Sequence, residues 1–170
     1  YNKRQVPEEL MIDQLFAEYL EKIYLEFPEA GLYEFLTETT AVMLEKQTNR
    51  ILIDRLMENP ETASGIMNKD IHSPYRTALR KGLLYEVTSP EMQTLVSFTY
   101  DKIFENLIAQ VLEQKGWSLE EVLQAVAKRF RPSYGGVIIY TAKQLSEADN
   151  EERKKLFCFY LDNWYKKGFA

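Results

Sequence analysis

The chain has 170 residues with a formal charge of −5, and 45% of its residues are apolar and 13% aromatic. This is enough for one domain, or for two small domains that share a core, so we do not expect disorder away from the ends. The acidic balance argues against a general attraction to nucleic acid or to anionic membranes. No apolar run approaches the ~20 residues that span a bilayer, so we expect no membrane association.

A single cysteine, Cys158, excludes an internal disulfide framework and predicts a reducing, cytoplasmic compartment. From Glu8 to Phe27, apolar residues recur at i, i+3 and i+4, which predicts an amphipathic helix that ends before Pro28. We expect residues 1–30 to form an N-terminal connecting helix. Because the chain opens at Tyr1 and at once enters a helical pattern, we interpret it as a piece of a longer protein or as a chain that lacks its start.

Two more helices are predicted next, from Leu32 to about Lys46 and from Arg50 to Met57. Asn59-Pro60 is expected to close the second of them. The segment from Glu61 to His72 is less regular, and Gly65 is expected to break any long helix there.

Ser73-Pro74 is a helix start signal, because serine accepts an orphan backbone N–H and proline has no N–H to lose in the first turn. The short helix 74–81 is expected to end at Gly82. Two β-rich runs, 83–88 and 94–99, are separated by a turn and predict a hairpin.

The run 94–99 leads directly into an amphipathic helix that starts at Tyr100 and ends at Gly116. Further helical patterns follow, so residues 116–170 are expected to form a C-terminal helical bundle, or the start of a helical repeat array. A weak domain boundary is expected near Gly116.

Residues 31–115 therefore supply two helices, a short third helix and a hairpin, which is the layout of a winged helix-turn-helix. The short third helix lies where a recognition helix would lie, and the hairpin lies where the wing would lie. The expected fold class is mainly α, with a winged-helix-like three-helix unit and a β-hairpin, extended by a helical bundle.

Two segments resemble a known family. VSFTYDKIFENLIAQVL at 96–112 resembles the end of the wing in signal-transduction ATPases with numerous domains (the STAND class, which includes NACHT proteins), and LFAEYLEKI at 15–23 is similar to the helix that follows their nucleotide-binding core. In that family an apolar residue and a histidine stand at the joint, and the histidine contacts the phosphate of the nucleotide. Here Phe98 matches the apolar position, Tyr100 stands in place of the histidine, and Asp101 follows.

The resemblance implies a non-catalytic regulatory and coupling segment of a larger NTP-dependent signalling or defence protein. Its partners would be an intramolecular nucleotide-binding core and helical sensor repeats, with ATP or ADP held by the parent protein. The chain contains no Gly-x-x-x-x-Gly-Lys-Ser/Thr motif, so we expect neither a cofactor nor enzyme activity of its own. Tyr100 and Asp101 would sense nucleotide or face another domain, although a tyrosine offers no cationic donor to a phosphate.

A free-standing winged-helix DNA-binding transcriptional regulator is the alternative. The segment 69–81 carries a local net charge of +3, and Tyr75, Arg76, Arg80 and Lys81 could contact DNA from the short helix. The same residues could instead form an interdomain surface or an ordinary solvated face. The acidic chain and the lack of basic residues in the wing turn favour these latter readings. An interaction module without a ligand is a third reading.

Other chemistry has little support in the sequence. No spacing of Asp, Glu, His and Cys resembles a metal site. His72 is the only histidine and reads as a loop residue, and Cys158 reads as a packed thiol. A pairing of these two as a catalytic dyad would lack any accompanying oxyanion motif.

Overall fold

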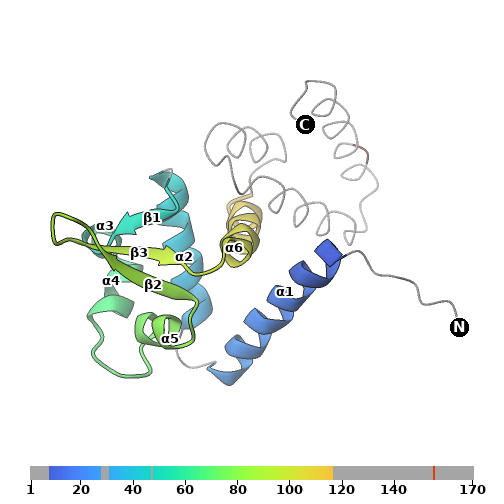
Figure 1. The fold of residues 1–170 in the computed structure, drawn as a ribbon, viewed down its shortest axis with the longest axis horizontal. Coiled ribbons are helices and arrows are strands. Elements are labelled where there is room, and N and C mark those ends of the chain that lie inside the picture. The colour runs from blue at the N-terminus through green and yellow to red at the C-terminus, as the bar shows by residue number, and fades with distance from the viewer. Residues whose placement is uncertain (1–7, 28–30, 47, 117–154, 156–170) are drawn as a thin grey trace, which may run out of the picture.

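The computed structural model describes residues 8–27, 31–46, 48–116 and 155, and this part of the chain is mainly α-helical with a small antiparallel sheet (Figure 1). In chain order the elements are α1 (Glu8–Glu26), α2 (Leu32–Glu45), β1 (Arg50–Leu52), α3 (Ile53–Met57), α4 (Pro60–Met67), α5 (Pro74–Arg80), β2 (Leu84–Thr88), β3 (Thr94–Phe98) and α6 (Asp101–Gln114). Among the described residues, no helix is both long and apolar enough to cross a membrane.

The sheet confirms the winged-helix-like fold. Its strand order is β1-β3-β2 and both pairings are antiparallel, with Ile51 opposite Val96 and Glu86 on the other side of Val96. Strand β1, which follows the first helix of the unit, therefore pairs with the last strand of the hairpin, and helices α3, α4 and α5 lie between these two strands in the chain. The expected C-terminal bundle at 116–170 lies outside the described residues, apart from Gly116 and Lys155.

The helix predicted from Arg50 to Met57 was wrong in its first half, which is strand β1. The hydroxyl of Thr48 donates to the Arg50 carbonyl and accepts from the Arg50 N–H, and so satisfies both backbone groups of that residue locally. Ile51 is buried against the sheet. Pairing with β3 thus decides the conformation of three residues whose spacing suits a helix equally well.

The first part of the segment expected to be irregular is helix α4, whereas residues 68–72 are a loop as expected. Asn59-Pro60 begins α4 instead of closing the previous helix. The Asn59 side chain accepts hydrogen bonds from the N–H groups of Glu61 and Thr62, and Pro60 occupies the first turn. Gly65 lies inside the helix. A Cβ at that position would stand 2.7 Å from the ring of Phe35, so glycine lets α4 approach α2 closely.

Helix α5 starts at Pro74 and ends before Gly82, both as expected, but its N-terminus is capped differently. Gly82 has a φ of +67°, and the N–H groups of Gly82 and Leu83 bond to the carbonyls of Leu79 and Ala78, which is the paired arrangement of a Schellman C-cap. Ser73 makes no capping hydrogen bond through its side chain, contrary to the expectation.

The core lies between the sheet and helices α2 and α6. Phe98 at the end of β3 stacks on Phe104 of α6, with ring centroids 5.1 Å apart, and Ile103 is fully buried beside them. The immediate start of a helix after β3 therefore buries these three residues together. Thr39 and Thr40 also lie in the buried part of α2, where the Thr40 hydroxyl donates to the Leu36 carbonyl.

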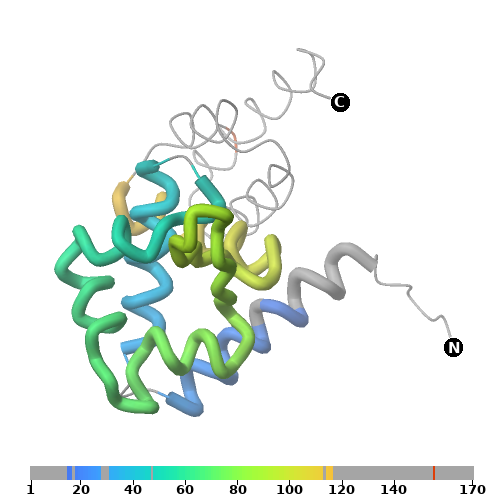
Figure 2. Tube along the Cα trace, turned by 60° about the vertical axis from the view of Figure 1, so that its left-hand side comes forward, coloured from blue at the N-terminus to red at the C-terminus, as the bar shows by residue number. Residues whose placement is uncertain are grey.

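Helix α1 runs along the outside of this unit, and both views place its C-terminal end next to α5 (Figures 1 and 2). It packs chiefly on α6, and its buried side chains include Leu20 and Ile23, each 3% exposed. Burial of one such side chain stabilises a fold by about 1.5–3 kcal/mol, so α1 is held mainly by apolar contacts.

Candidate interaction site at the end of α5

The basic residues of α5 are on its exposed side, but Tyr75 is not. Arg76 and Arg80 are exposed, whereas Tyr75 is buried and packs edge-on against the ring of Phe35. The Tyr75 hydroxyl donates to a carboxylate oxygen of Glu86 on β2 at 2.5 Å. Burial, and then this hydrogen bond, raise the pKa of Tyr75. Tyr75 is therefore turned away from the surface on which the sequence analysis placed it.

Lys81, directly after α5, contacts α1 through both its side chain and its backbone. The ammonium Nζ lies 3.1 Å from each carboxylate oxygen of Glu26. The carbonyl of Lys81 accepts a hydrogen bond of 2.9 Å from the hydroxyl of Tyr19, which lies seven residues before Glu26 on α1. Both partners of Lys81 therefore come from the helix that precedes the winged-helix unit.

An aromatic ring completes the contact. The ring of Phe27, just past the end of α1, lies under two cations, with its centroid 4.7 Å from the Lys81 Nζ and 5.7 Å from the guanidinium carbon of Arg80. Cation–π pairs of this kind contribute about 0.5–1 kcal/mol at exposed sites. We call Tyr19, Glu26 and Phe27 with Arg80 and Lys81 the α1–α5 contact.

The joint between β3 and α6 also reaches α1. Tyr100 is 47% exposed, and its ring lies 5.2 Å from the ring of Phe16, centroid to centroid. The carbonyl of Tyr100 accepts from the N–H groups of Ile103 and Phe104, so Tyr100 is the residue at which α6 begins. Asp101 is exposed in the first helical turn, where a carboxylate interacts favourably with the helix dipole.

The wing does not extend the basic surface of α5. Residues 84–98 contain Glu86 and Glu91 and no lysine or arginine. At the tip, Met92 has a φ of +61° and is largely exposed. A wing with only acidic charges repels a phosphate backbone, which leaves α5 without help from the hairpin.

Tyr24 contributes a polar group to the buried side of α1. Its ring packs edge-on against Tyr33 of α2, with centroids 5.2 Å apart. Its hydroxyl is buried and has no hydrogen-bond partner within the described ranges. Burial, followed by the charges of Tyr33 and Glu34, raises the pKa of Tyr24. A buried hydroxyl without a partner costs about 1–3 kcal/mol, so this residue opposes the docking of α1.

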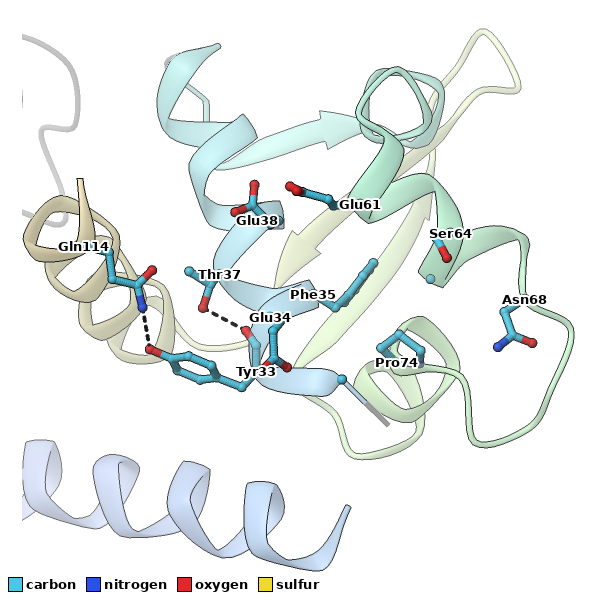
Figure 3. Close-up of a pocket in the computed structure, with 12 residues that line it drawn as sticks. Tyr33, Glu34, Phe35, Thr37, Glu38, Glu61, Ser64, Asn68, Pro74 and Gln114 are labelled. Carbon is cyan, nitrogen blue, oxygen red and sulfur yellow. Dashed lines mark hydrogen bonds between the residues drawn. The ribbon is translucent and has the colours of Figure 1, made fainter. Parts of the chain in front are cut away.

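A groove on another side of the unit has the opposite electrostatic character. It lies between α2, α4 and the start of α5, has a volume of about 660 Å³, and is lined by Phe35 and Pro74 together with three glutamates (Figure 3). Glu38 of α2 and Glu61 of α4 point toward each other across it. Burial, and after it the neighbouring Glu61, raise the pKa of Glu38.

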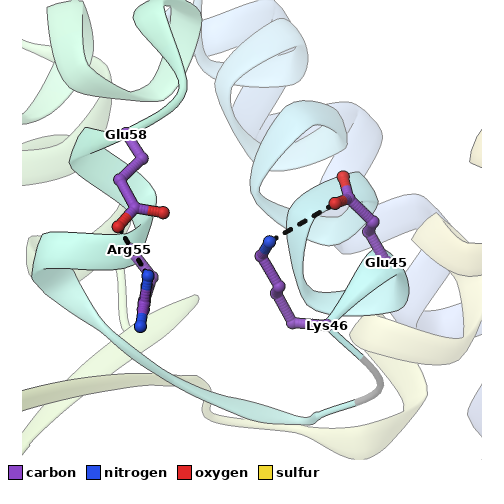
Figure 4. A network of polar contacts seen from close by, with 4 residues as sticks. All are labelled: Glu45, Lys46, Arg55 and Glu58. Carbon is purple, nitrogen blue, oxygen red and sulfur yellow. Dashed lines mark hydrogen bonds and ion pairs between the residues drawn. The ribbon is translucent and has the colours of Figure 1, made fainter.

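Other charged pairs are local. Glu45 pairs with its neighbour Lys46 at 3.4 Å, and Arg55 pairs with Glu58 one turn later at 2.7 Å, all with exposed side chains (Figure 4). Such pairs contribute between zero and about 1 kcal/mol and join no two elements. Within the residues that the structure describes, no group of His, Cys, Asp and Glu side chains could hold a metal ion.

The structure brings some of the sequence candidates together and separates others. Arg80 and Lys81 meet α1 at one end of α5, and Tyr100 meets the same helix elsewhere. His72 is exposed in the loop before α5, where its N–H donates to Asp70, and Cys158 lies outside the described residues.

Sequence reasoning missed Tyr19, Glu26 and Phe27, the α1 members of the contact. The only signal was that Tyr19 and Glu26 are polar groups seven residues apart, which places them on one face of a helix. Comparison with known proteins adds nothing to this assignment, because no family model, no curated protein and no solved structure matches the chain.

Proposed function

We propose that this chain is a non-catalytic regulatory and coupling segment of a larger NTP-dependent signalling protein. In this role the winged-helix unit packs against a nucleotide-binding core and relays sensing from helical repeats to that core. ATP or ADP would be bound by the parent protein. The proposal joins the resemblance of 15–23 and 96–112 to the STAND class with the geometry around α1.

One observation carries the proposal: α1 occupies the end of α5. In a DNA-reading winged helix the basic side chains of the third helix must be free to reach phosphates and base edges. Here the Lys81 ammonium is paired with Glu26 and lies over Phe27, and Arg80 lies over the same ring. This use of the basic end favours an intramolecular contact over a nucleic-acid contact.

Tyr100 gives the second support. It stands where the STAND resemblance has its histidine, and its ring packs against Phe16, which belongs to the segment that resembles the helix after the nucleotide-binding core. The two segments that carry the resemblance are therefore in contact. Tyr100 and Asp101 are both exposed enough to meet another domain.

The first experiment is to read the native open reading frame upstream of Tyr1. A Gly-x-x-x-x-Gly-Lys-Ser/Thr loop within a nucleotide-binding core is the expected result. In the full-length protein, Tyr100→Ala should then change the dissociation rate of bound ADP by about three- to tenfold, because it removes a contact of about 0.5–1.5 kcal/mol between the joint and α1. Glu91→Gln at the wing tip is the matched control and should leave that rate unchanged.

A start codon immediately before Tyr1, with no nucleotide-binding core, would overturn the proposal and favour the DNA-binding alternative. That alternative predicts duplex DNA binding that weakens as salt rises and is lost in Arg76→Ala/Arg80→Ala. The specific observation on its side is that Arg76, Arg80 and Lys69 are exposed on and beside α5. If the double variant leaves the observed duplex binding unchanged, α5 is not a recognition helix.

A further inference from the structure

The polar links between α1 and α5 converge on one residue. Tyr19 donates to the carbonyl of Lys81, Glu26 holds its ammonium, and Phe27 lies beneath that ammonium. The side chains of Glu26 and Lys81 keep 52% and 28% of their exposure, so water reaches the ion pair directly. A contact of this kind breaks at little cost and reforms in the same place.

The buried side of α1 carries a polar group that disfavours the packing of α1 on the winged-helix unit. The Tyr24 hydroxyl is buried against Tyr33 and finds no hydrogen-bond partner in the described part of the chain. When α1 separates from the winged-helix unit, water can form hydrogen bonds with this hydroxyl. The closed arrangement is therefore favoured by Lys81 and disfavoured by Tyr24, and the two residues act on the same helix.

Most of the buried apolar cluster belongs to the winged-helix unit, and α1 adds Leu20 and Ile23 to it. Phe98 stacks on Phe104, which joins β3 to α6, and Phe35 packs on Tyr75, which joins α2 to α5. Helix α1 lies on the flank of this core and packs chiefly on α6 (Figure 2). We therefore expect the sheet and its covering helices to stay folded when the α1 contacts are lost.

We propose that α1 is a latch on the winged-helix unit. The contacts of Lys81 hold α1 in place, and the buried Tyr24 hydroxyl favours its separation from the unit. Opening is a local event in which α1 separates from α5 and α6 while α2, the sheet and α5 stay folded. It frees Arg80, Lys81 and Tyr100 together from their contacts with α1. The inference rests on the proposed function only for the purpose of the movement, because the latch itself requires no nucleotide.

Native-state hydrogen exchange of the full chain, followed by mass spectrometry, tests the latch. The protection of amides 19–27 in α1 is compared with that of amides 36–44 in α2. Lys81→Ala keeps the Tyr19 hydrogen bond to the backbone and should lower α1 protection about three- to tenfold. Tyr24→Phe keeps the ring on Tyr33 and removes the buried hydroxyl, so it should raise α1 protection about tenfold. Neither variant should change the protection of α2.

Arg55→Ala is the matched control, because it removes an exposed ion pair that lies away from α1 and should leave both segments unchanged. The latch is wrong if amides 19–27 exchange only together with amides 36–44 in every variant, since α1 would then open only when the whole unit unfolds. Unchanged α1 protection in Lys81→Ala would mean that Lys81 does not hold α1 in place. Lower protection in Tyr24→Phe means that the hydroxyl stabilises docking, which contradicts its assigned role. None of these outcomes depends on whether a nucleotide-binding core exists.

Discussion

Two pairs of helices meet at the surface through charged side chains, and the two contacts have opposite electrostatic signs. Between α1 and α5, the Glu26 carboxylate faces the Lys81 ammonium at 3.1 Å. Between α2 and α4, Glu38 faces Glu61, a residue of its own charge (Figure 3). Both helix pairs nevertheless form, so these surface charges do not decide which helices pack together.

The difference lies in what supports each contact. Helices α2 and α4 approach so closely that only a glycine fits at position 65 beneath the Phe35 ring, and this packing outweighs the repulsion between the carboxylates. Helix α1 lacks such a close approach to α5 and depends there on Lys81. At α2–α4, packing establishes the contact and the charges change only its strength. At α1–α5 the contact is weaker, and the charges determine whether the two helices stay together.

The largest expected effect comes from removing the close packing. Gly65→Ala should destabilise the winged-helix unit by about 1–3 kcal/mol, because the new Cβ would overlap the Phe35 ring and force the two helices apart. Urea unfolding measures the change. Ser64→Ala, the exposed neighbour on α4, should have no cost. A Gly65→Ala protein as stable as Ser64→Ala would mean that the ring gives way, and that packing is not what holds α4 against α2.

Reversing a charge in the attractive pair should have a smaller effect. Lys81→Glu would place a carboxylate against Glu26 and weaken the docking of α1 by about 0.5–1 kcal/mol. The double variant Glu26→Lys/Lys81→Glu restores opposite charges and should recover part of that loss. A double-mutant cycle on the hydrogen-exchange protection of α1 gives the coupling between the two residues. Additive effects in the cycle would contradict a direct contact.

Neutralising the repulsive pair should stabilise the unit slightly, and only above acidic pH. Because the pKa of Glu38 is raised in the fold, the folded state binds this proton more tightly than the unfolded chain. That contribution is complete below about pH 4.5 and is lost as the pH rises through the folded pKa. Glu61→Gln should therefore add about 0.3–0.5 kcal/mol at neutral pH, after discounting for solvent screening, and nothing under acidic conditions.

Thermal unfolding at several pH values measures this change, with Glu91→Gln on the wing as the control. A gain for Glu61→Gln of the same size at every pH would show that the charge of Glu61 does not raise the pKa of Glu38.

The smallest effect is expected at the other end of α5. Arg76 is exposed, so Arg76→Ala should change the free energy of unfolding by less than about 0.5 kcal/mol and leave α1 protection unchanged. Urea unfolding and hydrogen exchange check both expectations. A loss of α1 protection comparable to that of Lys81→Ala would mean that the whole basic face of α5, and not its end alone, holds α1.

Most elements could be predicted from the sequence because their signals are local. The apolar period of α1, α2 and α6, the Gly82 C-cap and the β-branched runs of the hairpin are all read within a few residues. Strand β1 and helix α4 could not. The first depends on pairing with β3. In the second, the glycine is needed for close packing on Phe35, thirty residues earlier, and does not mark a helix break.

In the candidate site, too, features read from neighbouring residues could be predicted, whereas contacts between residues far apart in the sequence could not. Arg76, Arg80 and Lys81 were placed on the correct element, and Tyr100 at the correct joint. That Lys81 pairs with Glu26 could not be predicted, since the two are 55 residues apart and only the packing of α1 brings them together. Tyr75 was placed on the surface because a seven-residue helix offers too few positions for the apolar period to identify its buried side.

Helix α5 can also be considered as a mechanical element. At its start, the Tyr75 hydroxyl is tied to Glu86 on the wing strand, and just past its end Lys81 is tied to α1. Seven helical residues make a rod about 10 Å long that does not stretch, because its backbone hydrogen bonds close every turn. While α1 is docked, α5 therefore links it to the hairpin on the opposite side, and this link is lost when the contact at Lys81 opens.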